Sequence, residues 1–275
     1  MTPQPTDAGV IYIAFGESFR AEARQSIATL RSSSPRVACA VVTDSEWEDD
    51  PRPDHFVIRP SIRSLYCKPK YVYEASPFRR TLFIDTDTIV VRDLQPFFGL
   101  LDYYDVALRF VGPRLGGAEG LEFHPWCATG VLAYRKNDET ADLFGTWLTA
   151  YEQRMTETSG TPGRGVNEEP LFAEALARSR CRAIALGSDL CFNLAETIIT
   201  YSPPAVFHGR DSRLTTIAHE INDKWDPVAD YHPRLWMPNI KGLLPAGVRH
   251  SDPLLAAALI LRRGWNEIKR RMPRR

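Results

Sequence analysis

Residues 79–91 read RRTLFIDTDTIVV, an apolar run that leads directly into two aspartates one residue apart, Asp85 and Asp87. In an open α/β sheet, ligands collect beyond the carboxyl ends of the strands. Two carboxylates at such an end give a hard divalent cation its oxygen ligands, and its remaining positions can bind phosphate. The run therefore predicts a Mg²⁺ or Mn²⁺ site at a strand end of an α/β protein.

The residues before this run alternate between strand-like and helix-like patterns. Apolar, β-branched runs at 10–15, 37–43 and 56–58 predict buried strands. Apolar residues that recur every three or four positions predict helices over about 18–31 and 62–75. Strand–helix–strand units of this length form right-handed crossovers, so we expect the first part of the chain, to about residue 110, to be doubly wound.

The pattern after residue 111 is less regular. A glycine-rich stretch leads to a strand at 130–134 and then to a helix over about 138–154. Residues 155–166 are rich in Gly, Ser, Thr and Pro, a composition typical of functional loops and of disordered segments. We therefore expect a mobile loop over 155–166, either a functional lid or a disordered segment.

The end of the chain predicts a basic amphipathic helix over 251–275. Asp252 can cap this helix and Pro253 can occupy its first turn, while arginines accompany the apolar residues of 254–275. Such a helix could make a peripheral contact with the inner face of an anionic membrane. Alternatively, it could pack on the domain and end in a solvated basic tail.

The composition of the chain limits its function class. Its 275 residues are 44% apolar, which suits one α/β domain with a substantial core. The 34 basic and 34 acidic residues balance, so we expect no nucleic-acid partner. The five cysteines never form a Cys-x-x-Cys pair, which argues against a disulfide framework or a structural zinc site and favours a reducing, cytoplasmic location. No segment is long enough to cross a membrane.

The Asp-x-Asp triplet is common by chance, so its context decides among several interpretations. The simplest is a solvated turn after a strand. In a haloacid-dehalogenase-like phosphatase, Asp85 would be the phosphorylated nucleophile, but such enzymes carry it on their first strand and need a second acidic pair downstream. A nucleotidyltransferase would need a glycine-rich loop after the first strand, where this chain has only Gly16. A non-catalytic protein that binds nucleotide sugars is a further alternative.

Four segments of the chain resemble one family of enzymes, and they occur in the same order. The family comprises the glycogenin-like and bacterial lipopolysaccharide galactosyltransferase-like enzymes, retaining glycosyltransferases of the GT-A fold (family eight and its relatives). The segments are 68–90, which contains the Asp-x-Asp triplet; 128–134, which resembles an Asn-x-Gly-Val-Leu strand; 167–171, which resembles an Asn-Asp-Gln helix start; and 206–209, which resembles a late histidine near glycine.

The resemblance implies a fold and a division of the chain. The fold is α/β, a Rossmann-like doubly wound mixed sheet of the GT-A type, in a single domain over 8–250. Residues 8–110 would form the half that binds the nucleotide sugar, and residues 111–210 the acceptor half. The C-terminal helix at 251–275 would be an extension of this domain.

The resemblance also implies a metal site. In that family both aspartates of the triplet engage the donor and its Mn²⁺, and a late histidine completes the metal shell; here these are Asp85, Asp87 and His208. Carboxylate oxygens with one imidazole suit Mn²⁺, or Mg²⁺, better than Ca²⁺. The alternative for His208 is a histidine satisfied at a strand end. The family's late Lys-Pro-Trp is missing, and Arg210 or Arg213 could bind the diphosphate in its place or be surface charge.

Further donor contacts follow from the same comparison. Glu168 and Glu169 would lie near the donor sugar, although acids at a helix start also complement the helix dipole. The remaining candidate donor contacts are Gly16, Glu17 and Ser18 in the turn after the first strand, Thr86 in the triplet, and Lys68, for which Lys70 is an alternative.

The implied activity is transfer of a hexosyl group from a nucleotide-diphospho-sugar, with uridine as the expected base. The acceptor would be a glycan, a lipid-linked glycan or another molecule, and the anomeric configuration would be retained. The cation would stabilise the departing diphosphate as a Lewis acid.

Overall fold

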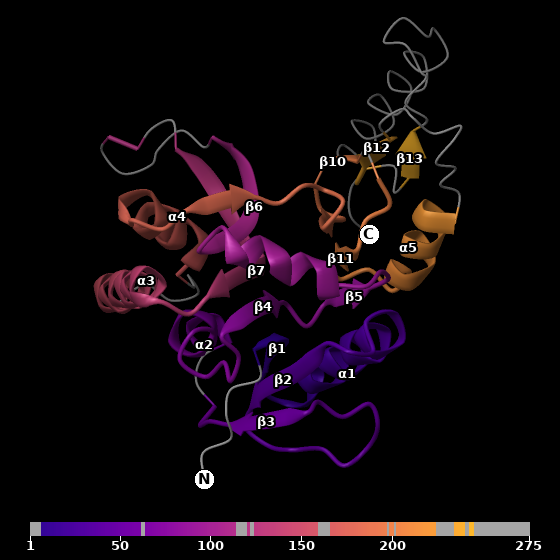
Figure 1. Ribbon diagram of the computed structural model, residues 1–275, viewed down its shortest axis with the longest axis horizontal. Helices are drawn as coiled ribbons and strands as arrows, with labels where there is room; N and C mark the ends of the chain where they lie inside the picture. Colours follow the sequence, from indigo (N-terminus) through magenta and orange to yellow (C-terminus); the bar gives the residue numbers. More distant parts are fainter. Residues whose placement is uncertain are drawn as a thin grey trace, which may run out of the picture.

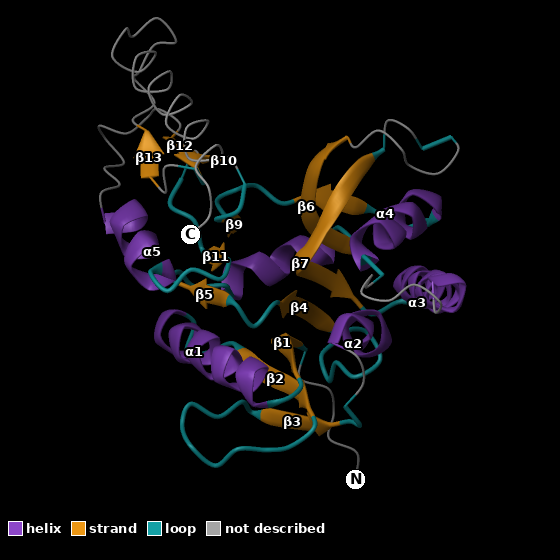
Figure 2. Ribbon diagram, turned by 180° about the vertical axis from the view of Figure 1, so that it is seen from behind, coloured by secondary structure: helices purple, strands orange, loops and turns teal. Residues whose placement is uncertain are grey.

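The computed structural model describes residues 7–61, 64–113, 120–121, 124–158, 166–196, 198–200, 202–223, 234–239 and 242–244. A seven-stranded sheet in the order β3-β2-β1-β4-β7-β6-β8 forms its centre, with helices on both faces (Figure 1 and Figure 2). Two three-stranded sheets lie beside it. The helix predicted over 251–275, with its membrane contact, lies outside the described residues.

The first half of the chain forms the parallel part of the central sheet. Its elements are β1 (Ala8–Ala14), α1 (Glu17–Ser33), β2 (Ala38–Thr43), β3 (His55–Ile58), α2 (Ser64–Tyr71) and β4 (Arg80–Ile84). Strand β1 pairs in parallel with β2 and β4, and β2 pairs in parallel with β3, so the doubly wound arrangement is confirmed. Helix α2 ends before the predicted residue 75. Residues 72–75 form hydrogen-bonded turns instead, and Pro77 disfavours helical backbone at Ser76, so the helix does not resume there.

The second half makes the sheet mixed. Its elements are β5 (Thr88–Val90), the 3₁₀ helix η1 (Gln95–Asp102), β6 (Val106–Pro113), β7 (Pro125–Arg135), α3 (Asp138–Thr158), α4 (Glu168–Arg178) and β8 (Ala183–Ala185). Strand β7 runs antiparallel to both β4 and β6. The loop predicted at 155–166 begins later than expected, because Met155 packs one turn beyond Tyr151 on the same core and prolongs α3. Residues 159–165 of that loop lie outside the described part.

Alternate residues of the central strands face two separate cores. Tyr12 and Leu82 pack with α1 and η1, whereas Ile11 and Phe83 pack with α2, α3 and α4. This alternation follows from the two-residue repeat of a strand, and it explains why β1 and β4 are apolar on both faces. Figure 1 shows α1 on one side of the sheet and α2 and α3 on the other.

The last described part of the chain returns to the end of β4. Its elements are β9 (Cys191–Asn193), β10 (Ile198–Thr200), β11 (Val206–His208), α5 (Leu214–Asp223), β12 (Arg234–Met237) and β13 (Gly242–Leu244). Strand β11 pairs antiparallel with β5, which sets His208 opposite Thr88, and parallel with β9. A small core of Ile89, Phe192 and Phe207 holds this sheet against α5. The pairing therefore brings residues near 208 to the Asp-x-Asp turn.

The structure also bears on two expectations from composition. The five cysteines, all within the described ranges, form no disulfide. Among the described helices, none combines the length and apolarity needed to span a membrane.

Candidate functional site

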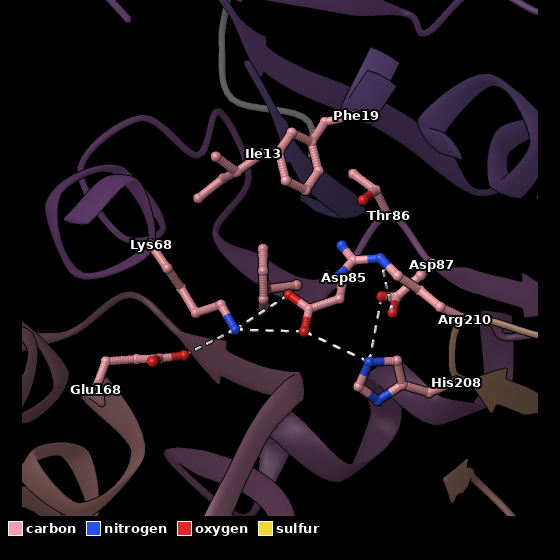
Figure 3. A pocket seen from close by; sticks show the side chains of 10 residues that line it. Ile13, Phe19, Lys68, Asp85, Thr86, Asp87, Glu168, His208 and Arg210 are labelled. Atoms are coloured by element: carbon pink, nitrogen blue, oxygen red, sulfur yellow. Dashed lines mark hydrogen bonds and ion pairs between the residues drawn. The ribbon is translucent and has the colours of Figure 1, made fainter. Parts of the chain in front are cut away.

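Asp85 and Asp87 lie directly beyond the carboxyl end of β4, where an α/β sheet binds its ligands. The Asp85 amide donates to the Gly130 carbonyl of β7 at 2.9 Å, and the Thr88 hydroxyl donates to the Asp85 carbonyl at 2.8 Å. These bonds fix the turn, so the two carboxylates face a cavity of about 400 Å³. The cavity is lined by Ile13, Phe19, Lys68, Phe83, Asp85, Thr86, Asp87, Glu168, His208 and Arg210 (Figure 3).

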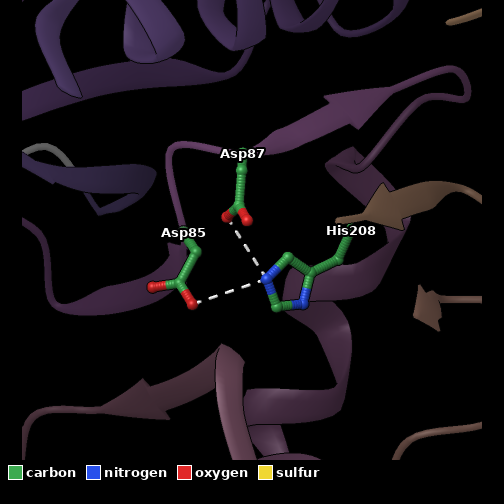
Figure 4. A group of neighbouring side chains, drawn as sticks. All are labelled: Asp85, Asp87 and His208. Carbon is green, nitrogen blue, oxygen red and sulfur yellow. Dashed lines mark ion pairs between the residues drawn. The ribbon is translucent and has the colours of Figure 1, made fainter. Parts of the chain in front are cut away.

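His208 closes a three-residue cluster with the two aspartates (Figure 4). Its Nε2 lies 3.3 Å from Asp87 Oδ1 and 3.6 Å from Asp85 Oδ2. Neighbouring ligands about 2.1 Å from an octahedral Mg²⁺ are separated by about 3.0 Å, so these side chains need only small shifts to share one ion. In the described part of the chain, this is the one cluster of His, Cys, Asp or Glu side chains close enough to hold a metal ion. The donor set fits a divalent cation of the Mg²⁺ or Mn²⁺ type.

The electrostatics of this cluster favour the charged forms of both His208 and Asp87. Burial alone would lower the pKa of His208, but the hydrogen bond to Asp87 and the charges of both aspartates raise it above its usual value. Burial would raise the pKa of Asp87, but the hydrogen bond and charge of His208, together with Arg210, hold it below its usual value. Without a metal, the cluster therefore favours a protonated histidine beside an ionised Asp87.

Gly130 provides the space that the cluster occupies. A Cβ at this position would lie 2.5 Å from His208 Cε1 and 2.9 Å from Asp85 Oδ2. Both distances are below any normal van der Waals contact, so a side chain here would displace the histidine or the carboxylate. The glycine of β7 is thus part of the site even though it contributes no side chain.

Lys68 lies on the opposite side of Asp85 from His208 (Figure 3). Its ammonium is 3.1 Å from Asp85 Oδ1, 3.2 Å from Glu168 Oε1 and 3.3 Å from Thr129 Oγ1. The side chain is only 15% exposed, and its ammonium lies 5.2 Å from the centre of the Phe83 ring. Burial alone would lower the pKa of Lys68, but Asp85 and Glu168 raise it, so the residue is a buried permanent cation. Lys70, the alternative from sequence, does not line this cavity.

The start of α4 places the two glutamates differently. Asn167 caps the helix by accepting from the Glu169 amide at 3.2 Å, and the buried Trp147 indole donates to the Glu168 carbonyl at 3.0 Å. Glu168 reaches the cavity, whereas Glu169 Oε1 accepts from the Thr129 amide at 3.2 Å behind it. Burial raises the pKa of Glu169 above its usual value, although the bond from Thr129 opposes this rise.

Arg210 covers the other end of the cavity and is held by α1. Its Nε lies 3.1 Å from Glu22 Oε1 and 3.8 Å from Asp87 Oδ2, and its guanidinium carbon lies 5.6 Å from the centre of the Phe19 ring. The Thr86 hydroxyl donates to the other oxygen of Glu22 at 2.6 Å. Arg213 pairs with Asp211 instead and does not line the cavity.

The three predicted donor contacts in the turn after β1 also lie outside this cavity. Gly16, at a φ of 80°, donates its amide to Asp44 at 3.2 Å and precedes α1. The Glu17 side chain is 68% exposed and pairs with Arg20, and Ser18 is exposed as well. The turn contributes to the lining through its flanks, Ile13 and Phe19. Nucleoside contacts by 16–18 stay a prediction.

Several residues of the site were not predicted from sequence as functional. Gly130 and Thr129 lay within a recognised strand motif, and a glycine inside a strand is itself a signal of close approach. Phe19 and Glu22 carried no signal, because helix α1 presents them only through its tertiary packing.

Comparisons with known proteins concern the fold. No protein-family model matches the sequence, and no curated protein is significantly similar to it. The galactosyltransferase LgtC, solved with donor and acceptor sugar analogues, is similar at 13% identity over 80% of this chain and 97% of that one, with a TM-score of 0.47. Mouse xyloside xylosyltransferase 1 gives 10% identity over 74% and 98% of the two chains and a TM-score of 0.46.

A third similar structure is the glycosyltransferase GlyE of Streptococcus pneumoniae, at 15% identity over 82% of this chain and 63% of that one, with a TM-score of 0.43. All three are named as glycosyltransferases. At these low identities and scores the likeness carries no argument about function, which rests on the geometry of the site.

Proposed function

We propose that this chain is a metal-dependent glycosyltransferase that uses a nucleotide-diphospho-sugar as donor. The observation that carries the proposal is the cluster of Asp85, Asp87 and His208 at the carboxyl end of β4, flanked by the cations Lys68 and Arg210 in one cavity. Two carboxylates and an imidazole are ligands for a divalent ion, and cations on either side suit the phosphates that such an ion would carry.

The charges that line the cavity support the joint binding of a cation and a diphosphate. Three carboxylates, Asp85, Asp87 and Glu168, face two permanent cations, Lys68 and Arg210, which leaves one negative charge when His208 is neutral. A divalent cation with a doubly charged diphosphate ester leaves this balance unchanged. Without a metal, a protonated His208 makes the lining neutral, and a diphosphate alone would leave two uncompensated negative charges, so we expect weak nucleotide binding without metal.

The charged residues in and beside the cavity have distinct roles in this proposal. When bound, the metal would act as a Lewis acid on the departing diphosphate. Arg210 would donate to phosphate oxygens, and Lys68 would move from Asp85 toward the same oxygens once the cation takes its place. Glu168 would accept hydrogen bonds from the donor sugar, and Glu169 would place a second carboxylate behind it, where negative charge favours an oxocarbenium-like sugar.

The finer parts of the proposal rest on the family resemblance. They are uridine as the base, Mn²⁺ as the metal, a hexosyl group transferred with retention, and a glycan, lipid-linked or other acceptor. The domain over 8–250, with a donor half at 8–110 and an acceptor half at 111–210, belongs to the same proposal. So do a cytoplasmic location and a peripheral membrane contact through 254–275, which cosedimentation with anionic vesicles at low salt would test.

The deciding experiment measures donor binding and its metal dependence. Calorimetry and a nucleotide-release assay would use UDP-, GDP-, ADP- and TDP-sugars with Mn²⁺, Mg²⁺ or EDTA. We compare the wild type with the double variant Asp85→Ala/Asp87→Ala and with Asp49→Ala, an exposed aspartate far from the cavity in sequence. We expect metal-dependent binding of one donor that only the double variant loses.

Other outcomes would redirect the assignment. Absence of binding for every nucleotide sugar under every metal would refute the proposal. Release of phosphate from p-nitrophenyl phosphate through a covalent Asp85 intermediate would instead identify a phosphatase. Binding without turnover over a broad acceptor panel would indicate a protein that only binds nucleotide sugars.

A further inference from the structure

Glu22 connects the two chain segments that build the candidate metal site. It lies on α1, and its side chain is 27% exposed. Its Oε2 accepts from Thr86, the residue between the two aspartates, at 2.6 Å, and its Oε1 accepts from Arg210 Nε, two residues beyond His208, at 3.1 Å. One carboxylate therefore holds both the turn after β4 and the loop after β11.

We propose that Glu22 is a positioning residue that fixes Arg210 for the diphosphate of a nucleotide ligand and anchors the metal-binding turn through Thr86. This inference rests on the proposed donor site. It adds a residue that neither lines the cavity nor belongs to the motifs that the sequence shares with the glycosyltransferase family.

The geometry at Arg210 explains why a positioning residue is needed. The Arg210 side chain is 62% exposed, and immobilising such a long, mobile side chain only when the ligand binds costs conformational entropy and weakens the affinity. Glu22 engages Nε, on the inner edge of the guanidinium, and the Phe19 ring lies beneath its carbon. Among the described residues no hydrogen bond or ion pair involves the two terminal nitrogens, which a bidentate contact with phosphate oxygens would use. Figure 3 shows Arg210 reaching across Asp87 toward Phe19, on the cavity side of the cluster.

The geometry at Thr86 explains the anchor. Thr86 is 5% exposed, and its hydroxyl turns to α1 while Asp85 and Asp87 face His208. Because the Thr86 hydroxyl bonds to α1 and not to the aspartates, this bond fixes the backbone between Asp85 and Asp87 without occupying either carboxylate. Both oxygens of Glu22 are used in this way, which leaves it as a support and not as a metal ligand.

The test is a double-mutant cycle on nucleotide affinity. Calorimetry with UDP, GDP, ADP and TDP at saturating Mn²⁺ would compare wild type, Glu22→Ala, Arg210→Ala and the double variant. Gln25→Ala, at an exposed position of the same helix, is the matched control. Saturating Mn²⁺ holds the aspartate turn in place, so this cycle isolates the role of Glu22 toward Arg210. We expect Glu22→Ala to weaken binding of the nucleotide that wild type prefers by about tenfold, and by less than about twofold when Arg210 is already alanine.

Further measurements separate positioning from general stability. Glu22→Gln keeps one acceptor oxygen and the side-chain shape, so it should retain part of the affinity, and it replaces Glu22→Ala if the alanine variant does not fold. We expect the melting temperature to change little in either variant. A loss of nucleotide affinity that is equal with and without Arg210 would overturn the proposal, as would wild-type affinity in Glu22→Ala.

The outcomes also distinguish this inference from the proposed function. If wild type binds a nucleotide with metal but Glu22→Ala binds it equally well, only the role of Glu22 falls. If wild type binds none of the four nucleotides, the donor site is refuted and the role of Glu22 with it.

Discussion

Replacement of Lys68 by methionine should change metal affinity and nucleotide affinity in opposite directions. The Lys68 ammonium lies 3.1 Å from Asp85, one of the expected metal ligands, and therefore competes with a cation for the same carboxylate. At an effective dielectric constant of about 20, two unit charges at this distance interact by about 5 kcal/mol. Only part of this interaction energy opposes metal binding, because the ammonium can stay paired with Glu168, 3.2 Å away, when a metal binds Asp85.

We therefore expect Lys68→Met to bind Mn²⁺ alone about tenfold more tightly, or about 1.4 kcal/mol. Nucleoside diphosphate at saturating Mn²⁺ should bind about tenfold more weakly, because one phosphate partner is lost. Calorimetry measures both affinities on the same protein. Lys70→Met is the matched control, since this neighbouring lysine does not line the cavity, and both of its affinities should stay within about twofold of wild type.

A third observable checks the same reasoning. Removal of one partner from a buried ion pair costs about 3–5 kcal/mol of folding stability because the remaining charge is unpaired. Lys68→Met leaves Asp85 and Glu168 without their shared cation, so the metal-free protein should melt at a lower temperature and recover with Mn²⁺. Unchanged or weaker Mn²⁺ binding in Lys68→Met would refute the idea that the ammonium holds the place of the metal.

Three further predictions follow from the site. Gly130→Ala should abolish metal binding, because its Cβ would lie 2.5 Å from His208, whereas Gly145→Ala, with open space around it, should leave calorimetric Mn²⁺ affinity unchanged. The pKa of His208 is higher in the folded protein than in the unfolded chain. Protonation of His208 therefore stabilises the metal-free protein fully at pH values below the unfolded-state pKa, and this stabilisation is lost as the pH rises through the folded-state pKa. Metal must displace that proton, so Mn²⁺ affinity should fall by up to about tenfold per pH unit below the folded pKa, a slope that His208→Asn should remove. Glu169→Gln should lower turnover more than nucleotide affinity, and Glu174→Gln on the exposed side of α4 should change neither; equal kinetics for the two variants would exclude Glu169 from the site.

The aspartate turn was predictable because its information is local. A run that is apolar on both faces predicts a buried strand, and carboxylates at its end predict where ligands bind. The same holds for β1 and α1, whose limits differ from the prediction by only a few residues. Boundaries failed where tertiary packing decided them, as at α3, which continues to Thr158 because Met155 still reaches the core.

His208 and Glu22 show what local sequence could not provide. His208 meets the aspartates because β11 pairs with β5 at Thr88, a contact between residues 120 positions apart (208 − 88). Nothing in the residues around 208 specifies that pairing, and only the family resemblance pointed to the histidine. A glutamate at a half-buried position of an amphipathic helix, such as Glu22, is normally solvated. Its partners Thr86 and Arg210 come from two other segments, so the contacts exist only in the folded protein.

Helix α3 positions both members of the Lys68–Glu168 ion pair. The Trp147 indole donates to the Glu168 carbonyl and the Tyr151 hydroxyl to the Val166 carbonyl, so α3 fixes the start of α4. Tyr151 also stacks on Tyr66 of α2, with 5.7 Å between the ring centres, and α2 carries Lys68. The Lys68–Glu168 pair is thus set by the buried aromatic residues of one helix, while the metal cluster is set by β4, β7 and β11.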